Sequence, residues 1–335
     1  MKFGLFIMGT KSSGYKDIVE QVEYAEELGF ESIVLGERHF RHGDLLYPSP
    51  YSMAAAFAAR TSRIRIGMAA RVLSLDHPIH IAEDAATLDI LSGGRLDFGV
   101  TRASLDEECH VVFQSSLNES TMRFKEALEV IVKAWTEEKF SYQGSVYKIP
   151  QVSVYPKPIQ KPYPPISIVA VSPETLIFAA EKGYSVVVGA IRSICELERV
   201  YEAYRRVLHE NGHNGMNAGF TVNRFIYVSD TFEKAKSEIE GPFLEFIKNR
   251  APDLRSALIF RYGNEGNFSF DRFINDFCII GSPETVTSRI KELTERINLS
   301  HLLCSLNYIT LDHSLCVKSM ELFAREVIPN LTTSH

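Results

Sequence analysis

Residues 61–100 read TSRIRIGMAARVLSLDHPIHIAEDAATLDILSGGRLDFGV and contain two strand-like runs on either side of one helical run. In residues 63–68 isoleucines alternate with arginines, which indicates a strand. Residues 77–91 place a proline in the first turn, as helices often do, and two glycines follow them. Residues 95–100 form the next strand-like run. The stretch therefore predicts two parallel strands joined by a right-handed helical crossover.

The same unit recurs along the whole chain. We predict eight strands, at residues 2–8, 32–35, 63–68, 95–100, 165–171, 184–190, 220–228 and 301–306. Helices are predicted at residues 15–28, 50–60, 77–91, 121–138, 173–182, 194–210, 231–249, 282–296 and 311–328. Eight such units are the number that closes a (β/α)₈ TIM barrel. An open doubly wound sheet is the alternative, but no G-x-G-x-x-G follows the first strand.

Two segments interrupt the alternation within what we predict to be a single domain, residues 1–330. Residues 139–163 contain a glycine turn and several prolines, which predicts a hairpin and an extended insertion after strand 4. Residues 251–277 are aromatic and without a clear period, so we predict a long loop after the seventh helix. Long loops in compact domains are usually functional, which makes this one a candidate lid.

The composition excludes several classes of protein. With 45% hydrophobic and 23% charged residues, the 335-residue chain has the proportions of a globular protein. A net charge of -6 argues against a nucleic-acid partner. We expect no membrane span, because no window approaches ~20 apolar residues, and the apolar first residues predict a strand, not a signal peptide. The five cysteines are scattered without a C-x-x-C, so we expect free buried thiols and a cytoplasmic protein.

Ligands of such barrels lie at the carboxyl ends of the strands, which selects the candidate residues. Strand 2 is followed by Glu37-Arg38-His39, which forms either a proton-handling site or a surface loop with an internal ion pair. Other candidate side chains at strand ends are Met8, Thr101, Arg102 and Arg192.

The helix after strand 5 begins with Ser172-Pro173-Glu174-Thr175, a strong capping sequence. An ordinary helix cap is one interpretation. The other is an anion site, because a helix N-terminus offers free N–H groups, and Arg102 on the neighbouring strand could add a bidentate contact. The sharper hypothesis is a phosphate between strands 4 and 5.

Other chemistries have weaker signals. His39 and His42, and also His77 and His80, have the spacing of paired metal ligands, but helix caps and loop polar groups explain them as well. No H-E-x-x-H, G-x-S-x-G or P-loop sequence occurs, so we expect no metal site and no nucleophilic catalysis.

The ordered set of motifs resembles the bacterial luciferase-like, flavin-dependent monooxygenase family. The resemblance covers nearly the whole chain and is carried by residues 61–100 together with MKFGLF (1–6), EELGFESIVLGERHF (26–40), STMRFKEALEVIVKAW (120–135), YPKPIQKPYPPISIVAVSPET (155–175) and IIGSPETVTSRI (279–290). It implies a (β/α)₈ barrel with an excursion after strand 4.

The resemblance also implies a flavin site. Ala69-Ala70 matches the position of a non-proline cis peptide that supports the isoalloxazine ring. Arg102 matches the arginine that holds the flavin phosphate, and Ser172 and Thr175 match hydroxyl positions of the same phosphate site.

Because of several departures from luciferase, we expect a relative of that enzyme and not a luciferase. Luciferase has Glu-His-His-Phe where residues 37–40 read ERHF. The luciferase histidine assigned to acid–base work is Arg38 here, so proton handling either passes to His39 or is absent. Glu37 matches a glutamate near the flavin. Thr101 stands in place of the reactive cysteine, which removes thiol chemistry.

The resemblance implies a two-component monooxygenase. A separate flavin reductase would supply reduced FMN, and O₂ would then oxygenate a small organic substrate. A cytoplasmic homodimer is expected. The implied catalytic residues are Glu37, Arg38 and His39, and the implied substrate contacts are Met8, Thr101 and Arg192. Three alternatives remain open: an F420-dependent oxidoreductase, a catalytically silent flavin-binding protein and, more distantly, a metal-dependent hydrolase.

Overall fold

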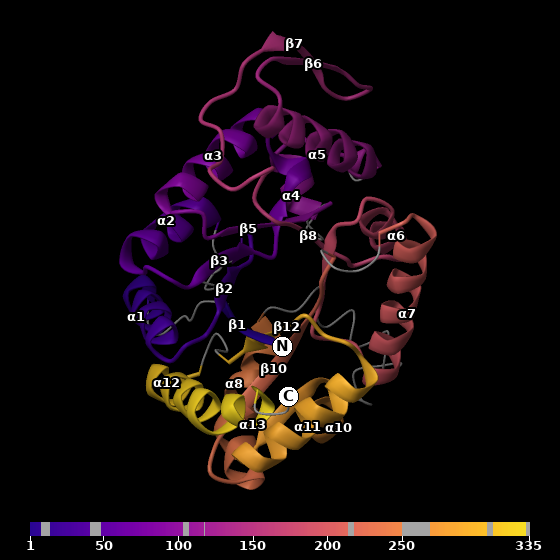
Figure 1. The fold of residues 1–335 in the computed structure, drawn as a ribbon. Coiled ribbons are helices and arrows are strands. Elements are labelled where there is room, and N and C mark those ends of the chain that lie inside the picture. The colour runs from indigo at the N-terminus through magenta and orange to yellow at the C-terminus, as the bar shows by residue number, and fades with distance from the viewer. Residues whose placement is uncertain are drawn as a thin grey trace.

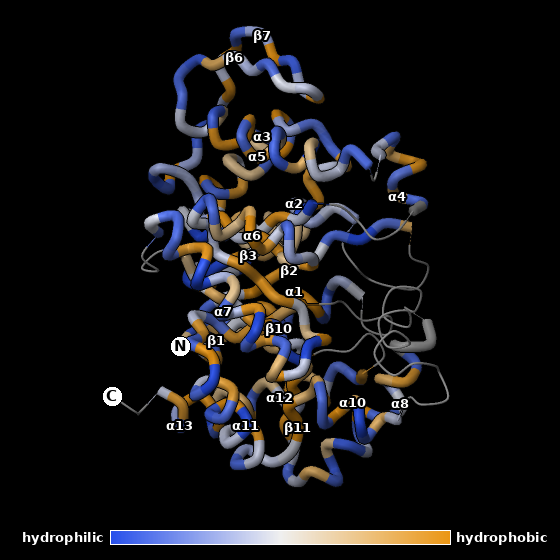
Figure 2. Tube along the Cα trace, turned by 90° about the vertical axis from the view of Figure 1, so that its right-hand side faces the viewer, coloured by the Kyte–Doolittle hydropathy of each residue, from blue (hydrophilic) through white to orange (hydrophobic). Residues whose placement is uncertain are grey.

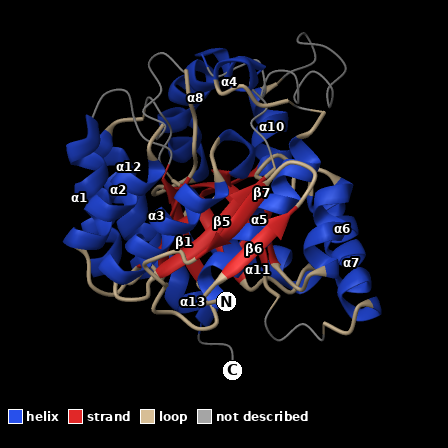
Figure 3. Cartoon of the chain, turned by 90° about the horizontal axis from the view of Figure 1, so that it is seen from above, coloured by secondary structure: helices blue, strands red, loops and turns tan. Residues whose placement is uncertain are grey.

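Eight parallel strands form a closed barrel, surrounded by helices (Figures 1 and 3). The computed structural model describes residues 1–7, 14–40, 48–102, 107–116, 118–213, 218–249, 269–306 and 311–332. The barrel strands are β1 (Lys2–Ile7), β2 (Ser32–Leu35), β3 (Arg65–Met68), β5 (Leu96–Thr101), β8 (Ile166–Val169), β9 (Ser185–Val188), β10 (Phe220–Val228) and β12 (His301–Ser305). Because β10 pairs with both β9 and β12, and β12 pairs with β1, the sheet closes. The predicted TIM barrel is confirmed.

The helices lie outside the barrel and cover its apolar strands (Figures 2 and 3). They are α1 (Gly14–Glu27), α2 (Pro50–Arg60), α3 (Pro78–Leu91), α4 (Glu107–Val112), α5 (Ser120–Thr136), α6 (Pro173–Glu181), α7 (Ile194–Glu210), α8 (Phe232–Asn249), α10 (Phe270–Phe277), α11 (Pro283–Arg296), α12 (His313–Leu322) and α13 (Ile328–Thr332). The helix predicted for residues 311–328 is divided, because a π-helical segment, Phe323–Val327, separates α12 from α13.

The prediction of an irregular loop over residues 251–277 is wrong at its C-terminal end. Ser269 caps α10, and four apolar side chains at helical spacing are buried there: Phe270, Phe273, Ile274 and Phe277. Burial of this apolar face explains why the aromatic segment forms a helix. Residues 251–268 lie outside the described residues, so the lid stays a prediction.

Two short strands were not predicted. β4 (Arg71–Val72) pairs with β5, and β11 (Cys278–Gly281) pairs with the second half of β10. Phe225 is paired with both Ser305 and Cys278, so β11 lies on the edge of β10 opposite β12. Both strands extend the sheet at the carboxyl ends of barrel strands.

The predicted insertion contains an antiparallel hairpin of β6 (Phe140–Gln143) and β7 (Lys148–Val152). It projects from the barrel next to α5 (Figure 1). The Glu126 carboxylate on α5 accepts hydrogen bonds from the backbone N–H groups of residues 145–147, at 2.7 to 3.0 Å. These three bonds fix the hairpin turn to the helix, so the hairpin prediction is confirmed.

Two expectations from composition concerned the state of the cysteines and the absence of a membrane-spanning helix. All five cysteines are free, but Cys195 is exposed, whereas we expected buried thiols. Within the described ranges, no helix is both long and apolar enough to cross a membrane.

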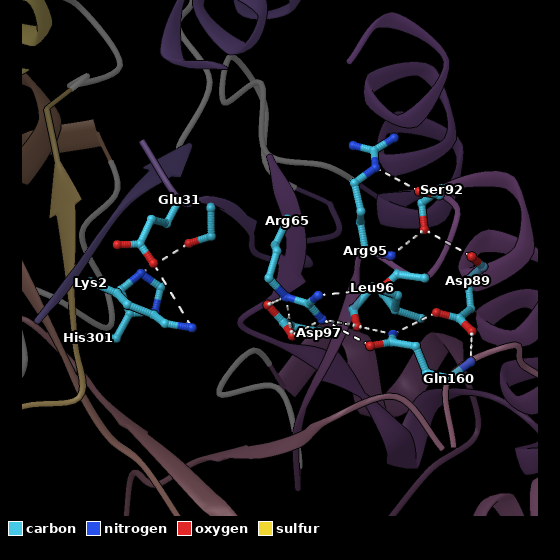
Figure 4. A network of polar contacts seen from close by, with 12 residues as sticks. Lys2, Glu31, Arg65, Asp89, Ser92, Arg95, Leu96, Asp97, Gln160 and His301 are labelled. Atoms are coloured by element: carbon cyan, nitrogen blue, oxygen red, sulfur yellow. Dashed lines mark hydrogen bonds and ion pairs between the residues drawn. The ribbon is translucent and has the colours of Figure 1, made fainter. Parts of the chain in front are cut away.

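Polar side chains cluster at the amino-terminal ends of the barrel strands (Figure 4). Arg65 on β3 pairs with Asp97 on β5 at 2.6 Å, and its Nη2 also donates to Gln160 Oε1 at 3.2 Å. Gln160, from the segment after β7, donates to Asp89 on α3 at 2.7 Å. This network ties the insertion to the base of the barrel.

His301, at the start of β12, is buried in the same region and gives a prediction about pH. Its Nε2 lies 3.1 Å from Ser32 Oγ (Figure 4). Burial, with the Lys2 charge nearby, lowers the pKa of His301 from 6.5 to about 4. Between these two values the unfolded chain binds more protons than the folded one. The free energy of unfolding should therefore fall as the pH drops from 6.5 toward 4, and this residue should add no slope above 6.5.

Urea unfolding at a series of pH values measures this slope. His301→Asn cannot titrate, so its curve should lack this contribution. Equal slopes for the two proteins between those pH values would contradict the assignment.

Candidate functional site

The candidate site begins where β3 ends. The peptide bond between Ala69 and Ala70 is cis, the geometry that the resemblance implies. The Ala69 N–H donates to the Leu35 carbonyl oxygen of β2 at 2.6 Å. On the other side, a β-carbon at Gly99 would lie 1.6 Å from the Met68 carbonyl oxygen. Glycine at that position of β5 therefore allows β3 to turn here. The role of Ala69-Ala70 in supporting a flavin stays a prediction.

Glu37 lies beside this turn, and its side chain is completely buried. One carboxylate oxygen accepts the Val72 N–H at 2.7 Å. The other contacts both Arg71 Nη1 and His39 Nε2, the latter at 2.9 Å. The structure thus brings Glu37 and His39 together, in a buried cluster and not in a surface loop. The third predicted catalytic residue, Arg38, is half-buried next to them.

Arg71 was missed as a site residue by the sequence reasoning. It pairs with Asp76 at 2.9 Å as well as with Glu37, and it lies over the Tyr51 ring at 5.9 Å. Burial alone would lower the pKa of Arg71, but the pKa is raised because the charges of Glu37, Tyr51 and Asp76 and the hydrogen bond to Glu37 together outweigh burial. The available signal was its position, because a charged residue directly follows Ala69-Ala70 at a strand end.

The His39 ring is held from two sides. Its Nε2 faces Glu37, and the ring packs edge-on against Phe113, with centroids 4.8 Å apart. Phe113 follows α4, and Phe40 packs against the same pair of rings. With Nε2 bonded to a carboxylate, Nδ1 is the ring nitrogen left to exchange a proton with a bound molecule. A histidine oriented by a carboxylate can serve in general acid–base work.

The predicted anion site lies at the ends of β5 and β8. Ser172 caps α6, and its Oγ accepts the Thr175 N–H at 3.4 Å and lies 3.0 Å from Thr175 Oγ1. Bonds from the Ser172 hydroxyl and from the backbone lower the pKa of Glu174, and the charge of Arg102 lowers it further. Since β5 pairs with β8, Arg102 lies near the start of α6, as predicted.

Arg102 has spare hydrogen-bonding capacity there. Its Nη1 donates to Thr121 Oγ1 at 3.0 Å. Its Nε is buried and has no hydrogen-bond partner among the described residues. A buried donor without a partner costs free energy. An anion near this helix terminus would satisfy it, so the residues present fit a phosphate group.

The remaining candidates are placed as follows. Thr101 ends β5 and is paired with Val72, which puts it between the Glu37 cluster and Arg102. Arg192 follows β9, and its carbonyl oxygen accepts a bond from the buried Arg224 at 2.7 Å. Met8 lies outside the described residues.

The histidine pairs give no metal centre in the part of the chain that the structure describes, where no group of three potential ligands occurs. His77 caps α3, because its Nδ1 accepts the Ile79 N–H at 3.3 Å. The helix-cap interpretation of His77 is therefore confirmed. His42 lies outside the described residues.

Comparisons with known proteins agree with this geometry. The chain is 27% identical over 356 residues to the alkanal monooxygenase alpha chain of Photorhabdus laumondii. The alignment covers 99% of this chain and 98% of the relative. It is 30% identical over 194 residues to the oxygenase component of a flavin-dependent trigonelline monooxygenase of Acinetobacter baylyi, covering 56% and 53% of the two chains.

Solved structures share the fold over nearly the full length. Monooxygenase RslO1 from Streptomyces bottropensis matches with a TM-score of 0.87 and 26% identity, covering 99% of this chain and 100% of that one. Two more distant structures share the fold alone, each covering 98% of both chains. They are the oxygenating constituent of 3,6-diketocamphane monooxygenase of Pseudomonas putida, in complex with FMN (TM-score 0.82, 20% identity), and the coenzyme F420-dependent tetrahydromethanopterin reductase of Methanopyrus kandleri (0.77, 22%).

The family model described as luciferase-like monooxygenase matches residues 1–298, which is most of the chain. Together with the barrel and its cis peptide, this match shows that the chain belongs to the luciferase-like monooxygenase family and is a flavin-dependent oxidoreductase.

Proposed function

We propose that this chain is the oxygenase of a two-component monooxygenase, which takes reduced FMN from a separate reductase and uses O₂ to oxygenate a small organic substrate. The observation that carries this proposal is the buried Nε of Arg102 near the N-terminus of α6, which has no hydrogen-bond partner among the described residues. An FMN-bound structure of the same fold and a relative that is an oxygenase component support it.

Each part of the site has a task in this proposal. Arg102, Ser172 and Thr175 would bind the phosphate, and the Ala69-Ala70 turn would support the ring. FMN, when bound and reduced, supplies the electrons that activate O₂.

The proton chemistry would belong to the Glu37 cluster. Glu37 holds His39 through Nε2 at 2.9 Å, so that Nδ1 can give or take a proton at the substrate. Arg71 pairs with the buried Glu37 carboxylate and holds it in place. Phe40 and Phe113 flank the imidazole and would help to exclude water. We propose that Arg38, Thr101, Arg192 and Met8 line the substrate side.

Rapid mixing tests the proposal. The protein is loaded anaerobically with reduced FMN and mixed with oxygenated buffer while the absorbance of oxidised flavin is followed. Because the site would shield the flavin from water, we expect that absorbance to return more slowly than for free FMN with serum albumin as control. Identical time courses with and without this protein would contradict the proposal.

An F420-dependent oxidoreductase is the second candidate, because the anion site formed by Arg102 and α6 also suits that phosphate-bearing cofactor. Titration of the protein with FMN and with F420 separates the two. Tight binding of F420 without binding of reduced FMN would favour the second candidate. We further propose a cytoplasmic homodimer, which sedimentation at several concentrations tests.

A further inference from the structure

The barrel contains a cavity of about 650 Å³ in the half that holds the amino-terminal ends of its strands. It opens among the amino-terminal ends of the strands, where the network of Figure 4 lies, and away from the candidate active site. TIM barrels usually fill this interior with layers of branched side chains. Here the barrel strands line the cavity with small or polar residues as well as apolar ones: Ser32, Gly67, Asp97, Ser167, Ser185, Thr221 and His301.

The inner end of the cavity is apolar. Val34, Val187 and Leu303 line it and pack together across the barrel. Phe6 and Ala69 pack against the same cluster. Since Ala69 belongs to the turn at the carboxyl ends of the strands, this cluster forms a wall between the cavity and the candidate active site.

The middle of the cavity is a ring of hydrogen-bonding groups. It lies two residues before the apolar cluster on β2, β9 and β12, which is about 6.6 Å along a strand. Ser32 bonds His301 Nε2, and no described residue bonds the other ring nitrogen. Ser167 and Thr221 line the cavity, and their hydroxyls make no hydrogen bond within the described ranges.

The mouth of the cavity is basic. Lys2, Arg205, His209 and His213 line it, but Lys2 Nζ lies 4.0 Å from a Glu31 carboxylate oxygen and His213 Nε2 bonds the Glu181 carbonyl oxygen, which leaves Arg205 as the principal cation. The one acidic lining residue, Asp97, is paired with Arg65 at 2.6 Å. Arg205 is exposed, forms no ion pair in the described part of the chain, and has its guanidinium 5.6 Å from the Tyr201 ring centroid. A guanidinium of this kind can bind a carboxylate through two hydrogen bonds.

We propose that this cavity is a binding site for a small amphipathic organic acid. The apolar end of the acid would contact the apolar cluster of Val34, Val187 and Leu303. A hydroxyl or carbonyl of the acid would bond to the hydrogen-bonding groups around Ser167 and His301, and the carboxylate would bind Arg205 at the mouth. The volume lies within the range of about 300–1,000 Å³ for small-molecule sites. Burial that holds His301 neutral, with a pKa of about 4, suits a neutral polar group there.

Isothermal titration calorimetry with three matched probes tests the proposal. The probe 3-hydroxyoctanoate has all three features, octanoate lacks the hydroxyl, and 1,3-octanediol lacks the charge. We expect 3-hydroxyoctanoate to bind, octanoate to bind roughly 2- to 10-fold more weakly, and the diol to bind at least about 10-fold more weakly. Absence of any 3-hydroxyoctanoate binding, or equal binding of all three probes, would overturn the proposal.

Two variants locate the site. Arg205→Ala should weaken 3-hydroxyoctanoate binding at least about 10-fold, whereas Arg206→Ala, its exposed neighbour that does not line the cavity, should bind like the parent protein. Ser167→Leu should narrow the cavity at its polar ring and remove one hydroxyl, so it should weaken 3-hydroxyoctanoate binding, with unchanged reduced FMN binding showing that the barrel is intact. If Ser167→Leu fails to fold, the arginine pair still decides, because equal affinities of the two arginine variants would place the acid elsewhere and overturn the proposal.

Discussion

Arg102→Ala is expected to weaken the binding of reduced FMN by roughly 10- to 150-fold, or about 1.5–3 kcal/mol, the range for a hydrogen bond to a charged group. The physical reason is specific to this side chain. Its Nη1 is used by Thr121, but its buried Nε has no partner among the described residues and lies near the helix that Ser172 caps. Anaerobic titration followed by flavin absorbance measures the change in affinity.

Two comparisons show whether the lost contact is to the phosphate. Reduced riboflavin has no phosphate, so the parent protein and Arg102→Ala should bind it equally. Arg102→Lys keeps the charge but loses the planar fork of donors, and its affinity for FMN should lie between the other two. Unchanged FMN affinity in Arg102→Ala would remove this residue from the site, and an equal loss for riboflavin would show a general distortion.

The barrel was predictable because local patterns decide it. Alternation in residues 63–68, a helix start at His77-Pro78 and the glycines after it are signals within one stretch, and their recurrence gives the strand count. The α10 helix was missed although its signals are local, because Ser269 caps it and its apolar residues have helical spacing, but it spans only eight residues at the end of a longer aromatic segment. The strand β11 could not be predicted from a local pattern, because it is defined by its pairing with β10.

In the candidate site, too, some residues could be predicted from local sequence and others depend on contacts between distant segments. Ser172 and Arg102 were found because each follows a strand, and adjacent strands of a barrel bring their ends together. Arg71 also follows a strand, yet its importance depends on Glu37, which is 34 residues away in sequence. The sequence suggested an ion pair only within Glu37-Arg38-His39 itself. Only the pairing of β4 with β5, and the turn at Ala69-Ala70, place the Arg71 guanidinium against the buried carboxylate.

Charged side chains are paired at one end of the barrel and exposed at the other. At the carboxyl ends, Glu37 and Arg71 neutralise each other inside the protein, so the net charge of -6 says little about the ligand there. At the amino-terminal mouth, Arg205 is exposed and forms no ion pair with any described residue. An acid bound at either end would therefore meet one local arginine, Arg102 or Arg205, and not a general positive field.

Glu37→Leu is expected to lower the free energy of unfolding by about 3–5 kcal/mol, the largest change predicted for this chain. The Glu37 side chain is completely buried and that of Arg71 is only 10% exposed. Removing the carboxylate leaves the guanidinium in the protein with Asp76 as its remaining anion, and it also leaves the Val72 N–H without its acceptor. Urea unfolding measures the loss, and His39 should lose its fixed orientation in the same variant.

A double-mutant cycle separates the ion pair from simple loss of packing. Glu37→Leu combined with Arg71→Met removes both charges, so it should recover much of the lost stability, since an apolar pair can replace a buried ion pair. Glu23→Leu is the matched control, because Glu23 pairs with Arg60 at 2.7 Å on the surface and its loss should change the stability far less than the loss of Glu37 does. If the double variant lost as much stability as the two single variants together, the unpaired charge would not be the cause of the loss in Glu37→Leu. Glu37 would then stabilise the fold only through its bond to the Val72 N–H and its own packing.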